Sequence, residues 1–344
     1  MSQIDPIPQS FETEALLDEF MSAPSPELIG DLERVPGDIL ILGAGGKMGP
    51  TLARMAKRAA SSKRVVAVAR FSAAGLREEL EQNGIETLAC DLLDAGAVKK
   101  LPRLENVVFM AGFKFGAQAD PGQTWAMNVQ VPATVADIFR AARIVAFSTG
   151  CVYPFATVRE GGSTEDVPPD PPGEYAITCL GRERMFEHYS KVHGTPGVLF
   201  RLNYAIDLRY GVLHDIAKNI LDGKPIDVSM GHVNVIWQGD ACSQALRCLA
   251  HCATPPVPIN VSGPEILPVR WLAAELGKRL GKAPDIVGEE ADRSWLTNTA
   301  RAVQLFGYPK VPVAAMMDWV ADWQLAGGRS LGKPTKFEVR SGSY

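Results

Sequence analysis

The 344-residue sequence lacks any apolar run long enough to cross a membrane, so no transmembrane segment is expected. It also lacks a strong charge of either sign, and a net charge of −4 excludes the basic surface typical of nucleic-acid-binding proteins. Residues 1–20 are polar and acidic, unlike a secretory signal peptide. We therefore expect a cytoplasmic protein without a nucleic-acid or membrane partner.

Cysteine is scarce, and no two cysteines form a C-x-x-C pair, so a zinc site is not expected. Most of the cysteines fall in apolar segments, where a reduced thiol behaves as a small apolar side chain. The sequence therefore predicts free thiols and no metal centre. The cysteines are Cys90, Cys151, Cys179, Cys242, Cys248 and Cys252.

From Asp38 onwards, short apolar runs alternate with segments of helical periodicity. Near-continuous Val, Ile, Leu and Ala runs are typical of strands that are buried on both faces of a parallel sheet. The predicted fold class is therefore α/β, a Rossmann-type doubly wound parallel sheet with a smaller C-terminal domain. Strands are expected at 39–42, 64–69, 85–90, 106–111, 144–148 and 198–202, and helices at 11–21, 28–32, 47–60, 76–83, 124–142, 175–192, 212–221, 241–252, 269–280 and 294–305.

A glycine-rich turn follows the first of these strands. Gly43, Gly46 and Gly49 stand at three-residue spacing, with Lys47 and Met48 before the last of them. The first glycine allows a tight turn, the second lets backbone amides approach a pyrophosphate, and the third lets the helix pack closely on the strand. The following helix N-terminus favours phosphate. Because a strand precedes the turn and a helix follows it, the turn predicts a nicotinamide dinucleotide site.

The end of the second strand bears on the choice of cofactor. An acidic residue there would accept hydrogen bonds from the ribose hydroxyls of NAD(H), but this strand ends at Arg70, which can pair with a 2′-phosphate. Lys47 adds a second cation. These two cations favour NADP(H), and NAD(H) is the alternative. Arg70 and Lys47 could also be two solvated surface charges with no role in cofactor binding. Asp91, before Leu92, could bind the adenine or cap a helix.

These features divide the chain into four regions. Residues 1–37 predict an N-terminal helical extension and 38–203 the NAD(P)-binding Rossmann domain. Residues 204–326 form mainly the substrate-binding part, with some return to the Rossmann sheet, and 327–344 form an extended tail. The two ends either belt the fold or build a homodimer contact.

Together the motifs resemble the extended short-chain dehydrogenase/reductase family, which includes sugar-nucleotide epimerases and dehydratases. The likeness runs from about residue 38 to 325 and rests on order and spacing. Beyond the glycines it includes the adenine-contacting pair Asp91–Leu92, the segment beneath the cofactor with Ala111 and Gly112, Asn128, the Ser/Thr strand end 147–153, and the Tyr helix from 173 with Glu187 further along.

The resemblance implies roles for individual residues. Tyr175 would be the proton donor or acceptor beside the nicotinamide, and Thr149 would hold the substrate oxygen. The family's Lys, one helical turn after the Tyr, is replaced here by Cys179. A neutral thiol cannot lower the pKa of the Tyr, and a three-unit shift corresponds to about 4 kcal/mol. Reduction of the substrate needs only a protonated Tyr, so the loss of the Lys should affect reduction less than oxidation or epimerisation.

A substitute cation is the other way to compensate. Lys114 lies just past the fourth strand, where the epimerase branch has a Lys near cofactor and substrate; the alternative is a solvated loop charge. Arg182 and Arg184 follow on the Tyr helix.

The second domain usually shapes the substrate pocket in this family, and the resemblance implies a sugar-like or polyhydroxylated carbonyl or alcohol substrate. We therefore expect an NAD(P)-dependent oxidoreductase or epimerase. The alternative is a non-catalytic NADP(H)-binding sensor, which the missing lysine would suit. Candidate polar substrate ligands are Asn203, Tyr204, Arg209, which could hold a carboxylate or phosphate, His232 and Asn234.

Overall fold

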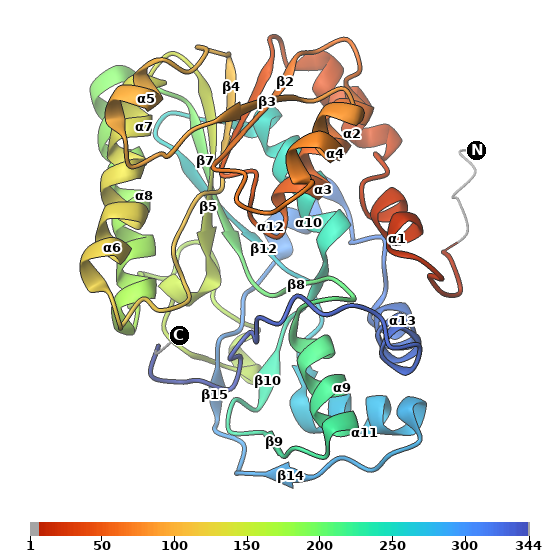
Figure 1. Ribbon diagram of the computed structural model, residues 1–344. Helices are drawn as coiled ribbons and strands as arrows, with labels where there is room; N and C mark the ends of the chain where they lie inside the picture. The colour runs from red at the N-terminus through yellow and green to blue at the C-terminus, as the bar shows by residue number, and fades with distance from the viewer. Residues whose placement is uncertain (1–6, 343–344) are drawn as a thin grey trace.

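Seven parallel strands form the central sheet of the computed structural model, which describes residues 7–342 (Figure 1). The predicted Rossmann-type sheet is confirmed. The strand order reverses between β1 and β4, and ligands of such sheets bind at the carboxyl ends of the strands at this point. In spatial order the strands are β12 (Val257–Val261), β7 (Gly197–Leu202), β5 (Arg143–Thr149), β4 (Asn106–Phe109), β1 (Ile39–Leu42), β2 (Val65–Ala69) and β3 (Glu86–Ala89).

Helices cover both faces of the sheet, which explains why its strands are almost entirely apolar (Figure 1). One face is covered by α5 (Ala95–Lys99), α6 (Pro121–Trp125), α7 (Val131–Ile138) and α8 (Gly173–His193). The other face is covered by α2 (Pro26–Arg34), α3 (Gly49–Ala59), α4 (Leu76–Gln82), α10 (Gln238–Arg247) and α12 (Ala300–Phe306).

A second core lies in the C-terminal part of the chain, around the buried rings of Trp237 and Trp319. Its helices are α1 (Glu14–Met21), α9 (Val212–Asp222), α11 (Val269–Leu280) and α13 (Val313–Leu325). Short strand pairs join the connecting segments: β6 (Ala156–Thr157) with β15 (Arg293–Ser294), β8 (Ala205–Ile206) with β11 (Ile236–Trp237), β9 (Ile226–Asp227) with β14 (Ile286–Val287), and β10 (His232–Val233) with β13 (Leu267–Pro268).

The N-terminal helices join the two cores. α1 packs beside α13, where Phe11 meets Trp319 with ring centroids 5.0 Å apart and the Trp319 indole donates to the Pro8 carbonyl at 2.8 Å (Figure 1). α2 contributes Leu28 and Leu32 to the core on the α3 side of the sheet. The extension is therefore part of the packed fold.

The structure departs from the sequence prediction at several helices: α5 was not predicted, and the helix predicted over 241–252 is α10, which ends at Arg247. The helix predicted over 124–142 is broken into α6, a π-helical turn (Ala126–Gln130) and α7, where Pro132 lacks an N–H for the regular ladder. The helix predicted over 294–305 begins only at Ala300. α13 was not predicted, because it buries apolar residues on more than one side and shows no clear polar face.

The C-terminal tail runs in an extended conformation between α9 and the Rossmann sheet (Figure 1). The Thr335 amide and hydroxyl both donate to Asp215 Oδ2, at 2.7 and 2.6 Å. Phe337 is buried in the second core, and Gly342 packs against the backbone of Pro172 and Gly173 at the start of α8. The tail thus connects α9 to the beginning of α8.

Within residues 7–342, no helix combines the length and the apolar character that crossing a bilayer requires.

Candidate cofactor and active site

The glycine-rich turn connects β1 to α3 at the point where the strand order reverses. Gly43 has φ +95°, and a Cβ there would lie 2.6 Å from the Ala111 nitrogen. A Cβ on Gly49 would lie 2.1 Å from the Ala44 carbonyl oxygen. At Gly46 the nearest atom would be 3.5 Å away, so the turn is open on that side. The turn therefore fits a dinucleotide pyrophosphate, held by loop amides and the N-terminus of α3.

A cavity of about 270 Å³ opens beside this turn, at the carboxyl ends of β1, β4, β5 and β7. It brings together residues from the turn, the strand ends, α8 and the start of the C-terminal part. Of the residues proposed for the site from the sequence, those that line it are Gly43, Gly46, Lys47, Met48, Gly112, Lys114, Thr149, Tyr175, Arg182, Asn203 and Tyr204.

Thr149 and Tyr175 reach the cavity from different elements. Thr149 ends β5, and its Oγ1 accepts a hydrogen bond from the Cys151 amide at 3.2 Å, which leaves the hydroxyl proton available to a ligand. Tyr175 stands in the first turn of α8, which begins where extended Pro172 gives way to Gly173 at φ +72°. Both hydroxyl side chains therefore face the same space.

The environment of Tyr175 favours its protonated form. Burial raises the pKa of Tyr175 well above its ordinary value near 10; the neighbouring Cys179 and Cys151 add to the rise, and the Arg182 charge opposes it. Burial also raises the pKa of the Cys179 thiol to about 11, so Cys179 is neutral at pH 7. Tyr175 and Cys179 form a side-chain hydrogen bond. Cys179 thus occupies the turn after Tyr175 without supplying charge.

Two cations lie close to this pair. The Lys114 Nζ is 5.6 Å from the centroid of the Tyr175 ring and donates to the Thr335 carbonyl at 3.5 Å. Burial lowers the pKa of Lys114. Arg182 donates to the Phe147 carbonyl at 2.7 Å and to Asn128 Oδ1 at 2.9 Å, so its guanidinium is fixed beneath the cavity. Lys114 is therefore a half-buried residue that lines the cavity and not a solvated loop charge.

Two glutamates of α8 differ in their surroundings: Glu183 contacts the strands behind the cavity, whereas Glu187 lies near the surface. Glu183 is fully buried, accepts from Ser148 Oγ at 2.6 Å, and pairs with Arg201 at 2.7 Å. Glu187 pairs with Arg184 near the surface, which leaves Arg184 outside the cavity. Glu183 thus ties α8 to β5 and β7 directly behind the Thr149 strand end.

Lys47 and Arg70 do not come together as one site. Lys47 enters the cavity, where its Nζ lies 3.0 Å from the centroid of the Tyr210 ring. Arg70 is exposed at the end of β2. The structure therefore gives no support to the expectation that both cations hold one 2′-phosphate.

The remaining predicted cofactor residues lie around the cavity without lining it. Asp91 is exposed, and its Oδ1 accepts from the Leu93 amide at 3.0 Å, while the cap of α5 is Asp94. Leu92 belongs to the core, and Ala111 packs under Gly43.

Three predicted substrate ligands lie elsewhere. Arg209 is buried in ion pairs with Asp207, Glu14 and Asp18, so its donors are already used. Asn234 is buried, donates to the Glu265 carbonyl and accepts from the Thr297 amide. His232 belongs to β10, away from the residues that line the cavity. These polar groups hold loops together, which the sequence pattern could not distinguish from ligand binding.

Other lining residues were not found from the sequence. Tyr210, Gln238 and Cys151 line the cavity, as does Thr335 of the tail. Cys151, two residues after Thr149, was within reach of the motif argument. Thr335 reaches the cavity only through the fold, so no local pattern could have indicated it.

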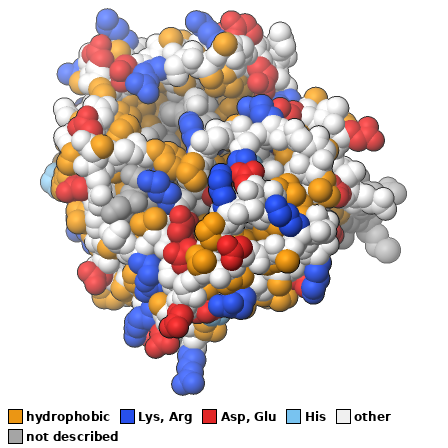
Figure 2. Space-filling model, turned by 60° about the horizontal axis from the view of Figure 1, so that its bottom comes forward, with side chains coloured by type: hydrophobic (Ala, Val, Ile, Leu, Met, Phe, Trp, Pro, Cys, Tyr) orange, Lys and Arg blue, Asp and Glu red, His pale blue; other side chains and the backbone are white. Residues whose placement is uncertain are grey.

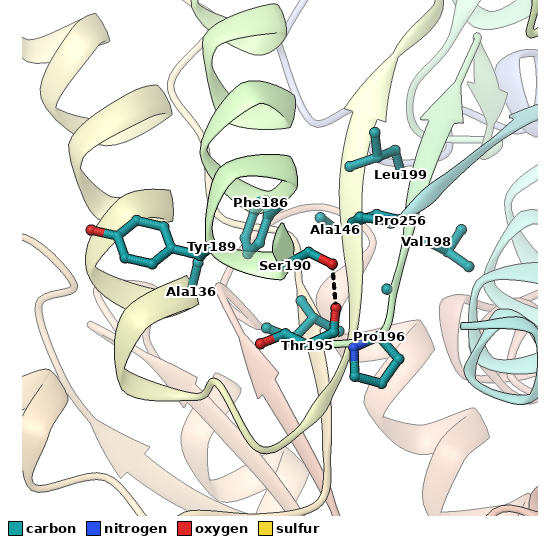
Figure 3. Close-up of a pocket in the computed structure, with 12 residues that line it drawn as sticks. Ala136, Ala146, Phe186, Tyr189, Ser190, Thr195, Pro196, Val198, Leu199 and Pro256 are labelled. Carbon is teal, nitrogen blue, oxygen red and sulfur yellow. Dashed lines mark hydrogen bonds between the residues drawn. The ribbon is translucent and has the colours of Figure 1, made fainter. Parts of the chain in front are cut away.

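A second, smaller cavity lies between α7, α8 and strands β5 and β7, away from Tyr175 (Figure 3). Its volume of about 10 Å³ has room for at most one water. The Ser190 hydroxyl beside it donates to the Thr195 carbonyl at 2.6 Å. It is therefore a packing gap. No cluster of three or more potential metal ligands occurs among residues 7–342.

The sequence and the fold were compared with known proteins. A comparison with curated proteins finds no match. Among solved structures, the UDP-glucuronic acid 4-epimerase of Bacillus cereus has a TM-score of 0.72 at 20% identity, covering 84% of this chain and 99% of that chain. The UDP-glucose 4-epimerase of Thermus thermophilus, in complex with NAD, has a TM-score of 0.69 at 20% identity, covering 83% of this chain and 98% of that chain.

The dTDP-glucose 4,6-dehydratase of Streptomyces venezuelae, with NAD bound, has a TM-score of 0.70 at 20% identity, covering 84% of this chain and 97% of that chain. These likenesses show a shared fold. The sequence itself matches the profile of the NAD dependent epimerase/dehydratase family over residues 39–239, more than half of the chain. The chain therefore belongs to the NAD-dependent epimerase/dehydratase family.

Proposed function

We propose that this protein is an NAD(H)-dependent oxidoreductase that reduces the carbonyl group of a sugar-like substrate, with Tyr175 as proton donor. The observation that carries the proposal is that Thr149 and Tyr175 line the same cavity as the glycine turn. A redox site of this kind needs a hydride carrier, a proton donor and a donor to the substrate oxygen within one enclosed space.

NAD(H) is proposed in place of the NADP(H) expected from the sequence. The family is described as NAD dependent, and the solved structures from Thermus and Streptomyces are described with NAD. Lys47 points into the cavity, so exposed Arg70 alone is a weak argument for a 2′-phosphate. The residues proposed to hold the cofactor are Gly43, Gly46 and Gly49 at the phosphates, Asp91 towards the adenine and Gly112 beneath it.

The protonation state of Tyr175 supports the reducing direction. A bound reduced nicotinamide supplies the hydride to the carbonyl carbon. Tyr175, kept protonated by burial, donates its proton to the carbonyl oxygen, and the Thr149 hydroxyl holds that oxygen by a hydrogen bond. The charge of Arg182, which opposes the rise of the Tyr175 pKa, then stabilises the tyrosinate that remains, in the place of the family's Lys.

The test is single-turnover NADH oxidation against a panel of sugar-like carbonyl compounds. Tyr175→Phe is expected to lower the rate of the best substrate by roughly 10²–10⁴-fold, because it removes the proton donor and keeps the ring. Tyr189→Phe, the same change on α8 beside the small packing cavity, is the matched control and should leave the rate unchanged.

Unchanged turnover in Tyr175→Phe would overturn the assignment of the proton donor. Tight NADH binding without hydride transfer to any carbonyl in the panel would favour the non-catalytic sensor instead. Binding of NADH and NADPH, measured by tryptophan fluorescence, should show the preference for NADH.

A further inference from the structure

The charges that line the cavity have one sign. Lys47, Lys114 and Arg182 line it, and its lining among residues 7–342 includes no Asp or Glu. Lys47 and Lys114 come from different elements, the glycine turn and the segment after β4, yet both flank one ring. Their Nζ atoms lie 5.1 and 5.8 Å from the centroid of the Phe115 ring. The face shown in Figure 2 is hollowed, and Lys and Arg side chains lie on it among Asp and Glu side chains.

We propose that the substrate is a small sugar-like acid without a nucleotide, and that Lys47 and Lys114 bind its carboxylate beneath the tail. This inference rests on the proposed function, because it names the substrate class of the same cavity. Arg182 is excluded from this role, since its guanidinium already donates to Phe147 and Asn128.

The nearest carboxylates are held by other donors. Asp215 accepts both hydrogen bonds of Thr335 and lies 3.4 Å from the His214 ring nitrogen. Asp207 is bonded by Arg209 through two nitrogen atoms. These two acids therefore have fixed structural partners, and a carboxylate brought by the ligand would supply the negative charge that the cavity lining lacks.

The ionisation of Lys47 agrees with a site built for an anion. Burial, together with the charges of Lys114 and Lys333, lowers the pKa of Lys47 to about 7, while Asp215 and Asp207 oppose the shift. The Tyr210 ring covers the ammonium group. A bound carboxylate would raise the pKa again, so a ligand of this class should take up a proton when it binds above pH 7.

The tail limits the size of the ligand. Thr335 and the glycine turn both line the cavity, and the neighbours of Thr335 in the tail are anchored on both sides. Phe337 is buried, Arg340 donates to the Arg293 carbonyl at 2.7 Å, and Gly342 packs against Pro172. A substrate must therefore fit between the turn and the tail, which suits a monosaccharide acid better than a nucleotide sugar.

The experiment is calorimetric titration of the NAD-saturated protein with glucuronate and galacturonate, each against glucose or galactose of matching configuration. At about pH 8, at least one acid should bind ~10-fold or more tighter than its neutral partner. Its heat should change with the ionisation enthalpy of the buffer, which reports proton uptake by Lys47.

Lys47→Met and Lys114→Met should each lose this preference by about 10-fold while keeping their affinity for NAD. Lys100→Met is the matched control: Lys100 is exposed at the C-terminal end of α5 and is not among the charges that act on Lys47, so the preference should change by less than about 2-fold. UDP, as the nucleotide probe, should not bind.

Equal binding of acid and neutral sugar, failure of both acids to bind, or retention of the preference in both lysine variants would overturn the inference. Proton uptake on NAD binding, with none on acid binding, would assign Lys47 to the cofactor and overturn it too. The proposed function fails separately, when the wild-type protein binds no NADH or reduces no carbonyl compound.

Discussion

Two clusters of cations, one buried and one half-buried, differ in what surrounds them. Arg209 is enclosed by the carboxylates of Asp207, Glu14 and Asp18, from two regions of the chain that are far apart in sequence. Lys47 and Lys114 face a cavity whose described lining has no carboxylate. The first arrangement is complete within the protein and stabilises the fold. The second is incomplete in the sense that the carboxylate of Asp215, which acts on both lysines, does not line the cavity. The neighbours of a cation thus help to distinguish a structural role from a binding role.

The largest effect is expected from breaking the complete cluster. Arg209→Met leaves the buried Asp207 without its partner, which should lower the free energy of unfolding by about 3–5 kcal/mol. Denaturant unfolding measures the change. Arg34→Met, which removes an exposed arginine of a single ion pair, is the control and should cost below about 1 kcal/mol. Equal losses in the two variants would show that Arg209 is not a structural centre.

A smaller effect is expected at the Lys47 and Lys114 cluster, where the ionisation of Lys47 makes stability depend on pH. The pKa of Lys47 is about 7 in the folded protein and near 10.5 when unfolded, so the unfolded state binds the extra proton between these values. The stability of the ligand-free protein should therefore gain a contribution from Lys47 as the pH rises above 7. Lys47→Met should lose this contribution while keeping the fold.

Thermal or denaturant unfolding measures the change in the free energy of unfolding between about pH 7 and 9. This change, the slope of stability against pH, should differ by at least about 1 kcal/mol between the wild type and Lys47→Met. The exposed Lys100→Met again serves as control and should keep the wild-type slope. A slope unaffected by Lys47→Met would mean that the lysine is not destabilised by its surroundings.

The smallest effect is expected at the exposed edge of the Arg209 cluster. Arg329 and Arg209 lower the pKa of Glu14 to about 2, so its contribution to stability is present above about pH 4.5 and is lost as the pH falls towards 2. Because the Glu14 side chain is 36% exposed, Glu14→Gln should cost less than about 1 kcal/mol at neutral pH. Acid unfolding curves should show the difference shrinking below pH 4, and a constant difference would contradict the assignment.

What could be predicted from the sequence was local. The turn Gly43–Gly49 lies within one β–α unit, and Thr149 and Tyr175 follow directly from a strand end and a helix start. Such short-range patterns fix the sheet, the turn and the residues that project from it.

What could not be predicted depends on contacts distant in sequence. The sequence alone suggests that Arg209 is free to bind an anion. In the fold, Arg209 pairs with Glu14 and Asp18, which lie in a helix nearly two hundred positions earlier. The side chain of Asn234 is likewise hydrogen-bonded to backbone groups that are distant in sequence. Thr335 joins the cavity because the tail crosses α9, which no periodicity in the tail indicates.

The position of the tail also determines when the cavity can be completed during synthesis on the ribosome. The glycine turn, Thr149 and Tyr175 are all synthesised within the first 175 residues, whereas the wall at Thr335 emerges after the last helix, α13, has been made. A nascent chain can thus assemble its nucleotide-binding half long before the cavity is enclosed. A chain released between α13 and Thr335 would contain the glycine turn and Tyr175 but would lack the wall that Thr335 adds to the cavity.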